Sequence, residues 1–473
     1  MNKEYPIVIG GENKFSENKK FVINPYDGTS VGKINYANWE DCNLAIENSL
    51  IAFEDFKNTQ AFTRSKILEN ASKILESRKE EIAKIITLES GKPIKLSRME
   101  IDRAIFTFKI ASEEAIRING SVQPLDNFPG IRNKKAISQK FPIGVILGIS
   151  PFNFPINLIA HKIAPAIASG NVCIIKPAPQ TPISAIYLAE VLLEAGLPKM
   201  AVNFLSCENL VAQKMVEDDR IAMLSFTGSA KVGWHLKNIS QKKKVVLELG
   251  GNAACVLDET ADLDFAIQKL IPAAFANSGQ SCIKAQRIYL HVDIANEFEI
   301  KFVDAVSKII SGDPMNDDTL IGPVISLNDA ERIQNWVLEA TSSGAKIIWG
   351  GKRKGSVFQP TILTNVDSTM KVVCEEIFGP VVTLQRFKDF STLCDEINLS
   401  RYGLQAGIFT NNHEKIMFAY NKLNVGAVIV NDVPTFRNDA MPYGGIKDSG
   451  IGREGIQSSI LEMTEEKLLI LDF

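Results

Sequence analysis

The chain has 473 residues, 45% of them apolar and 23% charged, a composition typical of a globular protein. It is too long for one ordinary hydrophobic core, so two or three domains are expected. Its 52 basic and 55 acidic side chains give a net charge of −3, with both signs dispersed. This balance argues against nucleic acid or an anionic membrane as a partner, and no apolar run is long enough to span a bilayer.

Cysteine and histidine usage predicts a cytoplasmic protein without a metal site. The cysteines are scattered singly without a C-x-x-C pair, and residues 1–11 make a poor secretory signal because Glu4 interrupts them. Free thiols are therefore expected rather than disulfides, and the four histidines lack ligand spacing. The seven cysteines are Cys42, Cys173, Cys207, Cys255, Cys282, Cys374 and Cys394.

The first elements along the chain are short alternating segments, at residues 5–9 and 20–24, typical of strands. Apolar side chains over residues 67–86 fall mostly on one face, which predicts a helix. Gly91 and Pro93 supply its stop signal.

Alternating strands and helices follow. Strand, helix, strand, helix predicts a parallel sheet with crossover helices, the plan of a dinucleotide-binding domain. The predicted strands are 145–149, 171–175 and 223–226, and the predicted helices are 157–168, 183–195 and 230–239.

The same pattern returns after Glu248, with a strand at 253–257, a helix at 261–276 and a strand at 287–292. A second α/β domain is therefore predicted. Residues 121–138 form an extended excursion between the helical and the strand-rich parts.

Three motifs carry the chemistry. Gly-Gln-Ser-Cys at 279–282 places Cys282 34 positions after Glu248, which opens a Glu-Leu-Gly-Gly run, and Ser-Pro-Phe-Asn-Phe-Pro at 150–155 places Asn153 earlier. A thiol, a carboxylate and a side-chain amide are the groups needed to oxidise an aldehyde through a thioester. With these motifs the chain resembles the aldehyde dehydrogenase superfamily, from Asn-Pro at 24–25 to Gly-Arg-Glu-Gly at 452–455.

The resemblance implies an α/β fold in three parts: a Rossmann-type cofactor domain, an α/β catalytic domain and a small β oligomerisation arm. We expect the cofactor domain at 1–120 and 142–249, the catalytic domain at 250–446, and the arm at 121–141 and 456–473. Residues 467–473 would supply the partner strand of the arm. At least a homodimer is expected, and a homotetramer is the alternative.

In the catalytic roles that the resemblance implies, Cys282 is the nucleophile and Glu248 the general base that activates water. The Asn153 amide and the Cys282 backbone N–H would stabilise the alkoxide. Without their motifs each residue has an ordinary interpretation: Cys282 as a buried small side chain, Asn153 as the cap of the next helix, and Glu248 as a surface residue before a turn.

The cofactor is expected to be NAD or NADP. A complete G-x-G-x-x-G is absent, and Phe-Thr-Gly-Ser at 226–229 with Gly233 takes its place at a strand-to-helix turn. By resemblance, Lys176 holds the adenosine ribose, while Glu376 and Phe378 embrace the nicotinamide ribose. The other expected cofactor residues are Ser150, Pro151, Phe152, Gly228, Ser229 and Leu249.

Pro179 marks a departure from the family, which often has Lys-Pro-Ser-Glu where this chain has Lys-Pro-Ala-Pro at 176–179. The missing carboxylate would bind the 2′-hydroxyl of NAD and repel a 2′-phosphate. We therefore expect NADP to be accepted. No new Arg is evident for the phosphate, so exclusive use of NADP does not follow.

Two charged positions at the substrate mouth favour a small polar aldehyde. Arg437 precedes the Pro-Tyr-Gly-Gly run at 442–445, and His161 follows Asn153 by eight residues. Either side chain could hold a hydroxyl or a carboxylate. Alternatively, Arg437 pairs with Asp439 and His161 is a helix residue with satisfied hydrogen bonds. The other expected substrate residues are Phe154, Ser281 and Tyr443.

The expected activity is oxidation of a short hydroxyaldehyde, such as lactaldehyde or glyceraldehyde, with succinate semialdehyde as the close competitor. An enzyme that forms acyl-coenzyme A is disfavoured because Glu248 is present. A non-catalytic protein that retains the fold is the alternative from another class.

Overall fold

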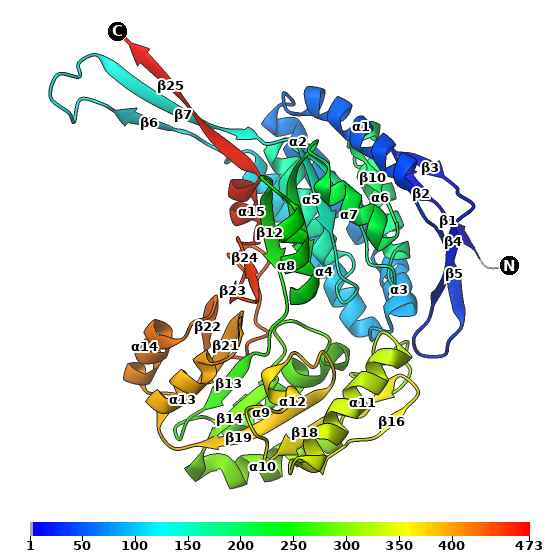
Figure 1. Ribbon diagram of the computed structural model, residues 1–473, viewed down its shortest axis with the longest axis vertical. Helices are drawn as coiled ribbons and strands as arrows, with labels where there is room; N and C mark the ends of the chain where they lie inside the picture. Colours follow the sequence, from blue (N-terminus) through cyan, green and yellow to red (C-terminus); the bar gives the residue numbers. More distant parts are fainter. Residues whose placement is uncertain (1–2) are drawn as a thin grey trace.

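The computed structural model of the protein describes residues 3–473, which form two α/β halves and a projecting arm (Figure 1). Within that range, no helix has both the length and the apolar character needed to cross a membrane.

The first half is built on an eight-stranded sheet whose five central strands run parallel. All residues of β8 and β9 are buried, because helices cover both faces of a parallel sheet. The predicted alternation of strands and crossover helices is confirmed. In sheet order the strands are β24 (Gly450–Ile451), β12 (Lys244–Glu248), β11 (Ile221–Thr227), β8 (Val145–Ile149), β9 (Val172–Lys176), β10 (Asn203–Phe204), β2 (Ile7–Ile9) and β3 (Glu12–Lys14).

The helix predicted over residues 67–86 is two helices, α2 (Ala61–Ser77) and α3 (Lys79–Ser90). Arg78 leaves the helical conformation at φ −100° and ψ 10°. The apolar periodicity continues across the break because both helices pack on the same core. Gly91 ends α3 in the left-handed region, as the sequence predicts. The other helices of this half are α1 (Trp39–Phe56), α4 (Ile94–Ala115), α5 (Asn157–Ser169), α6 (Ile183–Glu194), α7 (Asn209–Glu217) and α8 (Ala230–Ile239).

The second half has a seven-stranded sheet that is parallel except at the edge strand β15. In sheet order its strands are β15 (Lys346–Trp349), β18 (Thr361–Thr364), β19 (Val381–Phe387), β14 (Arg287–His291), β13 (Ala254–Leu257), β21 (Gln405–Phe409) and β22 (Ala427–Val430). Its helices are α9 (Leu263–Phe275), α10 (Val292–Ser307), α11 (Leu327–Ser342), α12 (Lys371–Cys374), α13 (Phe390–Asn398) and α14 (His413–Lys422).

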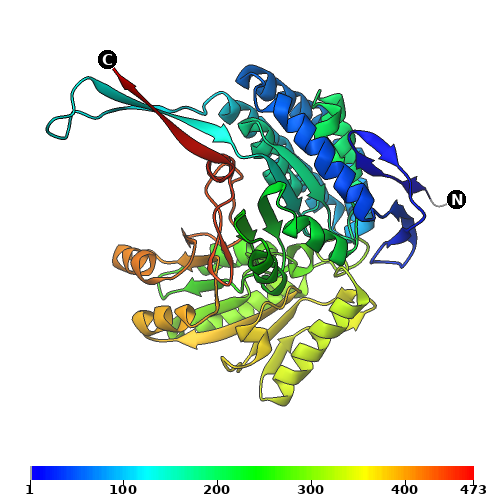
Figure 2. The same cartoon turned by 45° about the horizontal axis from the view of Figure 1, so that its top comes forward.

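The arm is an antiparallel sheet in the order β25-β7-β6, and it extends away from both halves (Figures 1 and 2). Its strands are β6 (Ser121–Pro124), β7 (Lys134–Pro142) and β25 (Thr464–Asp472). Lys467 pairs with Gln139 and Asp472 with Lys134, so the predicted partner strand is confirmed.

The chain returns to the first sheet after building the second. The short strand β24 pairs with β12, with Gly450 opposite Glu248. The predicted domain division left residues 447–455 unassigned, and β24 lies in this stretch. The helix α15 (Ile456–Glu462) then leads into the arm.

The remaining strands are short. They are β1 (Glu4–Tyr5), β4 (Lys19–Ile23), β5 (Ser30–Asn35), β16 (Arg353–Lys354), β17 (Val357–Phe358), β20 (Tyr402–Gly403) and β23 (Ile446–Lys447).

Candidate active site

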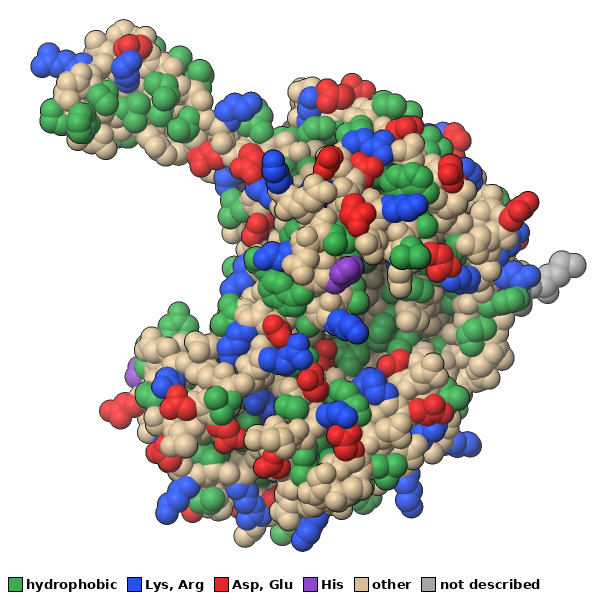
Figure 3. All heavy atoms as spheres, viewed as in Figure 1, with side chains coloured by type: hydrophobic (Ala, Val, Ile, Leu, Met, Phe, Trp, Pro, Cys, Tyr) green, Lys and Arg blue, Asp and Glu red, His purple; other side chains and the backbone are tan. Residues whose placement is uncertain are grey.

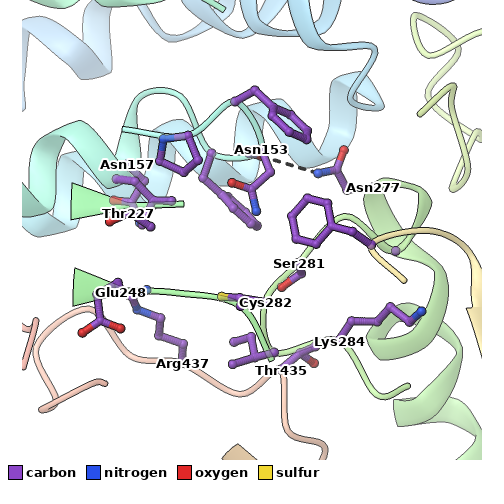
Figure 4. Close-up of a pocket in the computed structure, with 18 of the residues that line it drawn as sticks. Asn153, Asn157, Thr227, Glu248, Asn277, Ser281, Cys282, Lys284, Thr435 and Arg437 are labelled. Carbon is purple, nitrogen blue, oxygen red and sulfur yellow. Dashed lines mark hydrogen bonds between the residues drawn. The ribbon is translucent and has the colours of Figure 1, made fainter. Parts of the chain in front are cut away.

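A cavity of about 520 Å³ is lined by residues from both halves of the molecule, as the close-up in Figure 4 shows. Most of the site residues predicted from the sequence line it. They are Cys282, Glu248, Asn153, Pro151, Phe152, Phe154, Gly228, Ser229, Leu249, Ser281, Glu376, Phe378, Arg437 and Tyr443.

Five predicted residues do not line the cavity. They are Ser150, Lys176, Pro179, Gly233 and His161. Ser150 and Lys176 stand at the ends of adjacent parallel strands, where the Ser150 N–H donates to the Lys176 carbonyl at 3.1 Å. Gly233 lies in α8, where an added Cβ would come within 2.3 Å of Leu249.

Cys282 lies on a tightly folded loop that follows α9. Asn277, Ser278 and Gly279 all have positive φ, and a Cβ at Gly279 would come within 2.3 Å of the Gly379 carbonyl oxygen. The Cys282 Sγ lies 3.1 Å from the Tyr443 hydroxyl. Burial raises the pKa of the Cys282 thiol to about 11, although the Tyr443 hydrogen bond opposes this shift.

Glu248 ends β12 between two neighbouring strands, with Thr227 opposite it on one side and Gly450 on the other. It is buried, unlike the surface glutamate of the alternative interpretation. Neither carboxylate oxygen has a hydrogen-bond partner among residues 3–473. Burial, and then the charge of Glu454, raise the pKa of Glu248 well above its usual range. Ionisation of Glu248 is therefore disfavoured by its surroundings.

Asn153 lies between β8 and α5 and does not cap the helix. Its Nδ2 donates to the Gln280 carbonyl at 3.0 Å, which ties it to the loop of Cys282. Glu100 performs the capping instead, because its Oε1 accepts from the N–H groups of Ile156 and Asn157. The Asn153 amide thus retains a second N–H that can face the cavity.

We call Cys282, Glu248, Asn153 and Tyr443 the reaction end of the cavity. We call Lys92, Arg103 and Arg437, together with Asp439 behind the cavity wall, its charged end.

Asp439 is the centre of the charged end. It accepts two hydrogen bonds from Arg103, at 2.7 and 2.9 Å, one from Asn157 at 3.1 Å, and it lies 2.7 Å from His161 Nε2. Burial opposes ionisation, but the hydrogen bonds from His161 and Arg103 hold the pKa of Asp439 far below its usual range. His161 is therefore a buried partner of Asp439 and does not reach the cavity, whereas Arg103 and Asn157, which bind the same carboxylate, do.

Arg437 pairs mainly with Glu454, whose Oε2 lies 3.1 Å from its Nη2. The alternative pairing with Asp439 is looser, with a nearest N–O distance of 3.8 Å. The guanidinium also stacks 3.8 Å from the ring centre of Tyr443. Arg437 is therefore fixed in position while it lines the cavity.

Lys92 and Arg103 were not found from the sequence. Both lie beside the Phe154 ring, with Lys92 Nζ 4.0 Å from its centre, and Lys92 also pairs with Glu100. They precede the first motif, at 150–155, by about 50 residues, and no sequence motif around them indicates a role in the site. The packing of α4 against α5 brings Arg103, and Lys92 just before the start of α4, to the cavity.

The cleft between α8 and the second sheet has the features of a cofactor site. Gly228 precedes Ser229, the N-cap of the ten-residue helix α8, where backbone N–H groups favour a phosphate. Glu376 accepts from the Gly251 N–H at 3.0 Å, and burial raises the pKa of its carboxyl to about 7. Phe378, at φ 46°, contacts Phe152 edge to face, with ring centres 5.8 Å apart.

The chain is similar to known proteins over nearly its whole length. The model of the aldehyde dehydrogenase family matches residues 13–469. The chain is 42% identical to 3-sulfolactaldehyde dehydrogenase of Priestia aryabhattai, over 99% of this chain and 98% of that protein.

Two solved structures are also similar. Aldehyde dehydrogenase 21 of Physcomitrella patens, in complex with the reaction product succinate, is 42% identical with a TM-score of 0.98, and the match covers 100% of this chain and 99% of that one. A glyceraldehyde-3-phosphate dehydrogenase of Methanocaldococcus jannaschii, complexed with NADP, is 36% identical with a TM-score of 0.93 and covers 97% and 100%.

Proposed function

Because this chain belongs to the aldehyde dehydrogenase family, we propose that it oxidises a short aldehyde with a hydroxyl or anionic group to the carboxylic acid. The observation that carries the proposal is the charged end of the cavity. Lys92, Arg103 and Arg437 all line it, within a cavity of about 520 Å³. A long alkyl chain would cover these cations without offering them a hydrogen bond or a negative charge, which is unfavourable.

Basic side chains outnumber the carboxylates that they pair with at this end. Burial raises the pKa of Glu248 well above its usual range, which disfavours a further negative charge here. Four basic side chains, Lys92, Arg103, Lys162 and Arg437, stand against three carboxylates, Glu100, Asp439 and Glu454. A substrate with one negative charge would balance the four basic side chains, and a substrate hydroxyl could accept a hydrogen bond from one of them.

The relatives favour a short hydroxyaldehyde. 3-Sulfolactaldehyde and glyceraldehyde 3-phosphate, named for two of them, combine a hydroxyl group with an anion on three carbons. Lactaldehyde and glyceraldehyde offer the same hydroxyl group without the anion. Succinate semialdehyde is the second candidate, because the neighbour that contains succinate has a TM-score of 0.98 to this chain.

The reaction begins at Cys282. Its thiol loses a proton to solvent, and the thiolate sulfur attacks the aldehyde carbon, which moves the carbonyl π pair to oxygen and forms a thiohemiacetal alkoxide. The alkoxide that develops is stabilised by the Asn153 amide and the Cys282 backbone N–H. When bound, the nicotinamide cofactor supplies the acceptor for the hydride whose removal makes the thioester.

Glu248 acts in the second half of the reaction. As a carboxylate it removes a proton from water, whose oxygen attacks the thioester carbon. The carbon–sulfur bond breaks, the acid leaves, and the proton returns to the Cys282 sulfur. The unpartnered oxygens of Glu248 support this role, because a buried carboxylate without hydrogen bonds is free to bind a water molecule.

The cleft residues fit a dinucleotide cofactor, and we propose that NADP is accepted as well as NAD. A Cβ at Gly250 would come within 2.2 Å of Glu376, so a glycine there lets the Glu376 carboxylate lie close to the backbone. Pro179 brings no carboxylate to the adenosine end. Burial lowers the pKa of Lys176, and the nearby Glu208, which pairs with Lys20, opposes this shift. Lys176 and Lys20 would then favour a 2′-phosphate.

We also propose that the arm associates with another copy of the chain. Figure 3 shows hydrophobic side chains gathered on its surface. Leu468, Leu469, Ile470 and Val122 are each more than half exposed, which is costly in a monomer. Light scattering should give a homodimer or a homotetramer, and a monomer would contradict this part of the proposal.

The test of the function is the initial rate of NAD+ and NADP+ reduction with lactaldehyde, glyceraldehyde, succinate semialdehyde and hexanal. Cys282→Ala serves as the blank. We expect the highest kcat/KM with a short polar aldehyde and activity with both cofactors. A preference for hexanal would overturn the substrate class, and a strict requirement for NAD would overturn the cofactor proposal.

A further inference from the structure

Two buried polar side chains just after Cys282 have no part in the chemistry described above. Lys284 and Gln286 alternate on the segment that runs from the catalytic loop into β14. Both are at least 97% buried. A buried lysine without a carboxylate partner is costly, and burial lowers the pKa of Lys284 to about 7. What these side chains bind should therefore account for their presence.

Both side chains bind residues 375–381, which we call the cofactor loop because it contains Glu376 and Phe378, and Gln286 also donates to the Val372 carbonyl at 3.1 Å. Lys284 Nζ donates to the carbonyls of Gly379 and Val381, at 2.7 and 2.5 Å. Figure 4 shows this side chain extending away from Cys282.

Gln286 binds the other part of the loop. Its Nε2 donates to the Glu375 carbonyl at 2.6 Å, and its Oε1 accepts from the Ile377 N–H at 3.1 Å. Lys284 and Gln286 thus hold the loop on both sides of Phe378.

Phe378 is the strained point of the loop. At φ 46° it has a left-handed backbone, which is unfavourable for a bulky aromatic residue. Such a conformation persists only where the surroundings determine it, and the hydrogen bonds from Gln286 to Ile377 and from Lys284 to Gly379 flank it directly. These bonds therefore fix the direction in which Phe378 and Glu376 face the cleft.

We propose that Lys284 and Gln286 are positioning residues that hold the cofactor loop in a fixed place relative to Cys282. The strands that follow the two segments, β14 and β19, are paired in parallel, with Arg287 opposite Thr383. The hydrogen bonds of Lys284 and Gln286 to the cofactor loop, which we call the clamp, continue the pairing of β14 with β19 toward the cavity. They link the position of the Cys282 thiol to that of the loop that would bind the nicotinamide end of the cofactor. This inference rests on the proposed function, in which Glu376 and Phe378 bind the cofactor.

The test separates cofactor binding from the thiol chemistry. Lys284→Met keeps the length of the side chain and removes its N–H donors, and Gln286→Met does the same for the amide. The measurements are the NADPH dissociation constant by fluorescence, the KM for NADP+, kcat, and the cofactor-independent hydrolysis of p-nitrophenyl acetate by Cys282. Lys244→Met is the matched control, because Lys244 also donates to two backbone carbonyls but lies outside the cavity.

We expect Lys284→Met to weaken NADPH binding and raise the KM for NADP+ by about tenfold, the effect of losing a hydrogen bond to a charged group. Ester hydrolysis should change less than about twofold, and Lys284→Gln, which keeps N–H donors, should restore part of the affinity. If Lys284→Met does not fold, Gln286→Met should show the same split.

Unchanged NADPH affinity in both variants would overturn the inference, as would a parallel loss of ester hydrolysis and NADPH affinity. Neither NADPH binding nor ester hydrolysis requires the correct aldehyde. If the wild-type protein oxidises none of the aldehydes, the substrate proposal fails while these two measurements still decide the role of the clamp.

Discussion

At the charged end of the cavity Asp439 is fully engaged with Arg103, Asn157 and His161, whereas at the reaction end both Glu248 oxygens lack a hydrogen-bond partner within residues 3–473. Buried polar groups are usually paired, so these two carboxylates differ in kind, although Arg437 Nε at the charged end also lacks a partner among the same residues. The paired cluster is rigid before any ligand arrives and suits recognition. The unpaired Glu248 oxygens can form hydrogen bonds to substrate or water atoms as these change during the reaction. Substitutions at the two ends should therefore have different signatures.

The largest effect should come from Cys282→Ala, which removes the reaction end and leaves the charged end intact. Aldehyde oxidation should be lost, because no other group at this end can form the thioester. Protection of the variant by succinate in thermal unfolding should remain close to that of wild type. Cys394→Ala, a buried cysteine in α13, is the control and should keep its activity. Residual turnover in Cys282→Ala would contradict the covalent mechanism.

The next largest effect is expected for Glu248→Gln, which keeps the shape of the site but removes the base. Turnover should fall by roughly 10²- to 10⁴-fold, the usual contribution of a general base, while a burst of one NADPH per active site remains. In wild type, hydrolysis should decline as the pH falls through the raised pKa of Glu248, because only the carboxylate accepts a proton. Stopped-flow absorbance measures both phases. Glu217→Gln, at an exposed position in α7, is the control, and an unchanged steady-state rate in Glu248→Gln would remove it from this role.

A selective effect is expected for Arg103→Met at the charged end. The kcat/KM for succinate semialdehyde should fall by about 10- to 100-fold, since a hydrogen bond to a charged group contributes roughly 1.5–3 kcal/mol. The kcat/KM for hexanal should change little. Arg98→Met, on the same helix but paired with Glu80 and Asp317, is the matched control. An equal loss for both aldehydes would mean that Arg103 supports the fold rather than the substrate.

The smallest effect concerns Tyr443, which links the two ends because it stacks on Arg437 and its hydroxyl lies 3.1 Å from Cys282 Sγ. Tyr443→Phe should raise the pKa of Cys282 further, because the thiolate loses a hydrogen bond. Alkylation of Cys282 by iodoacetamide, followed by mass spectrometry, should then require higher pH than in wild type. Alkylation of Cys374 is the internal control, and an unshifted profile at Cys282 would show that Tyr443 does not stabilise the thiolate.

Local pattern was enough to predict the elements that position the motifs. The strand at 145–149 and the helix at 230–239 have the predicted bounds, because a buried parallel strand and an amphipathic helix leave clear periodicities. The break at Arg78 was missed, since the apolar face continues across it. The division into domains at 249 and 250 remains a prediction.

At the site, too, local sequence patterns reveal the residues in motifs but not those that tertiary packing places. Cys282, Glu248 and Asn153 stand in dense motifs, and the structure brings them to one cavity. Arg103 and Lys284 stand in no motif, because what places them is tertiary packing: α4 against α5 for Arg103, and the pairing of β14 with β19 for Lys284. His161 lies near the motif but behind Asp439, since sequence spacing does not reveal which face of α5 meets the cavity.

The pairing of Gly450 with Glu248 also sets an order in time. Strand β12 is complete at residue 248, but the strand that closes its edge is made about 200 residues later. At roughly 5–20 residues per second, a ribosome needs about 10 to 40 s to cover that distance. Throughout this interval the nascent chain can form the parallel strands of the first sheet, but not the strand that pairs with the end of β12 at Glu248. The surroundings of Glu248 are therefore complete only when synthesis is almost finished.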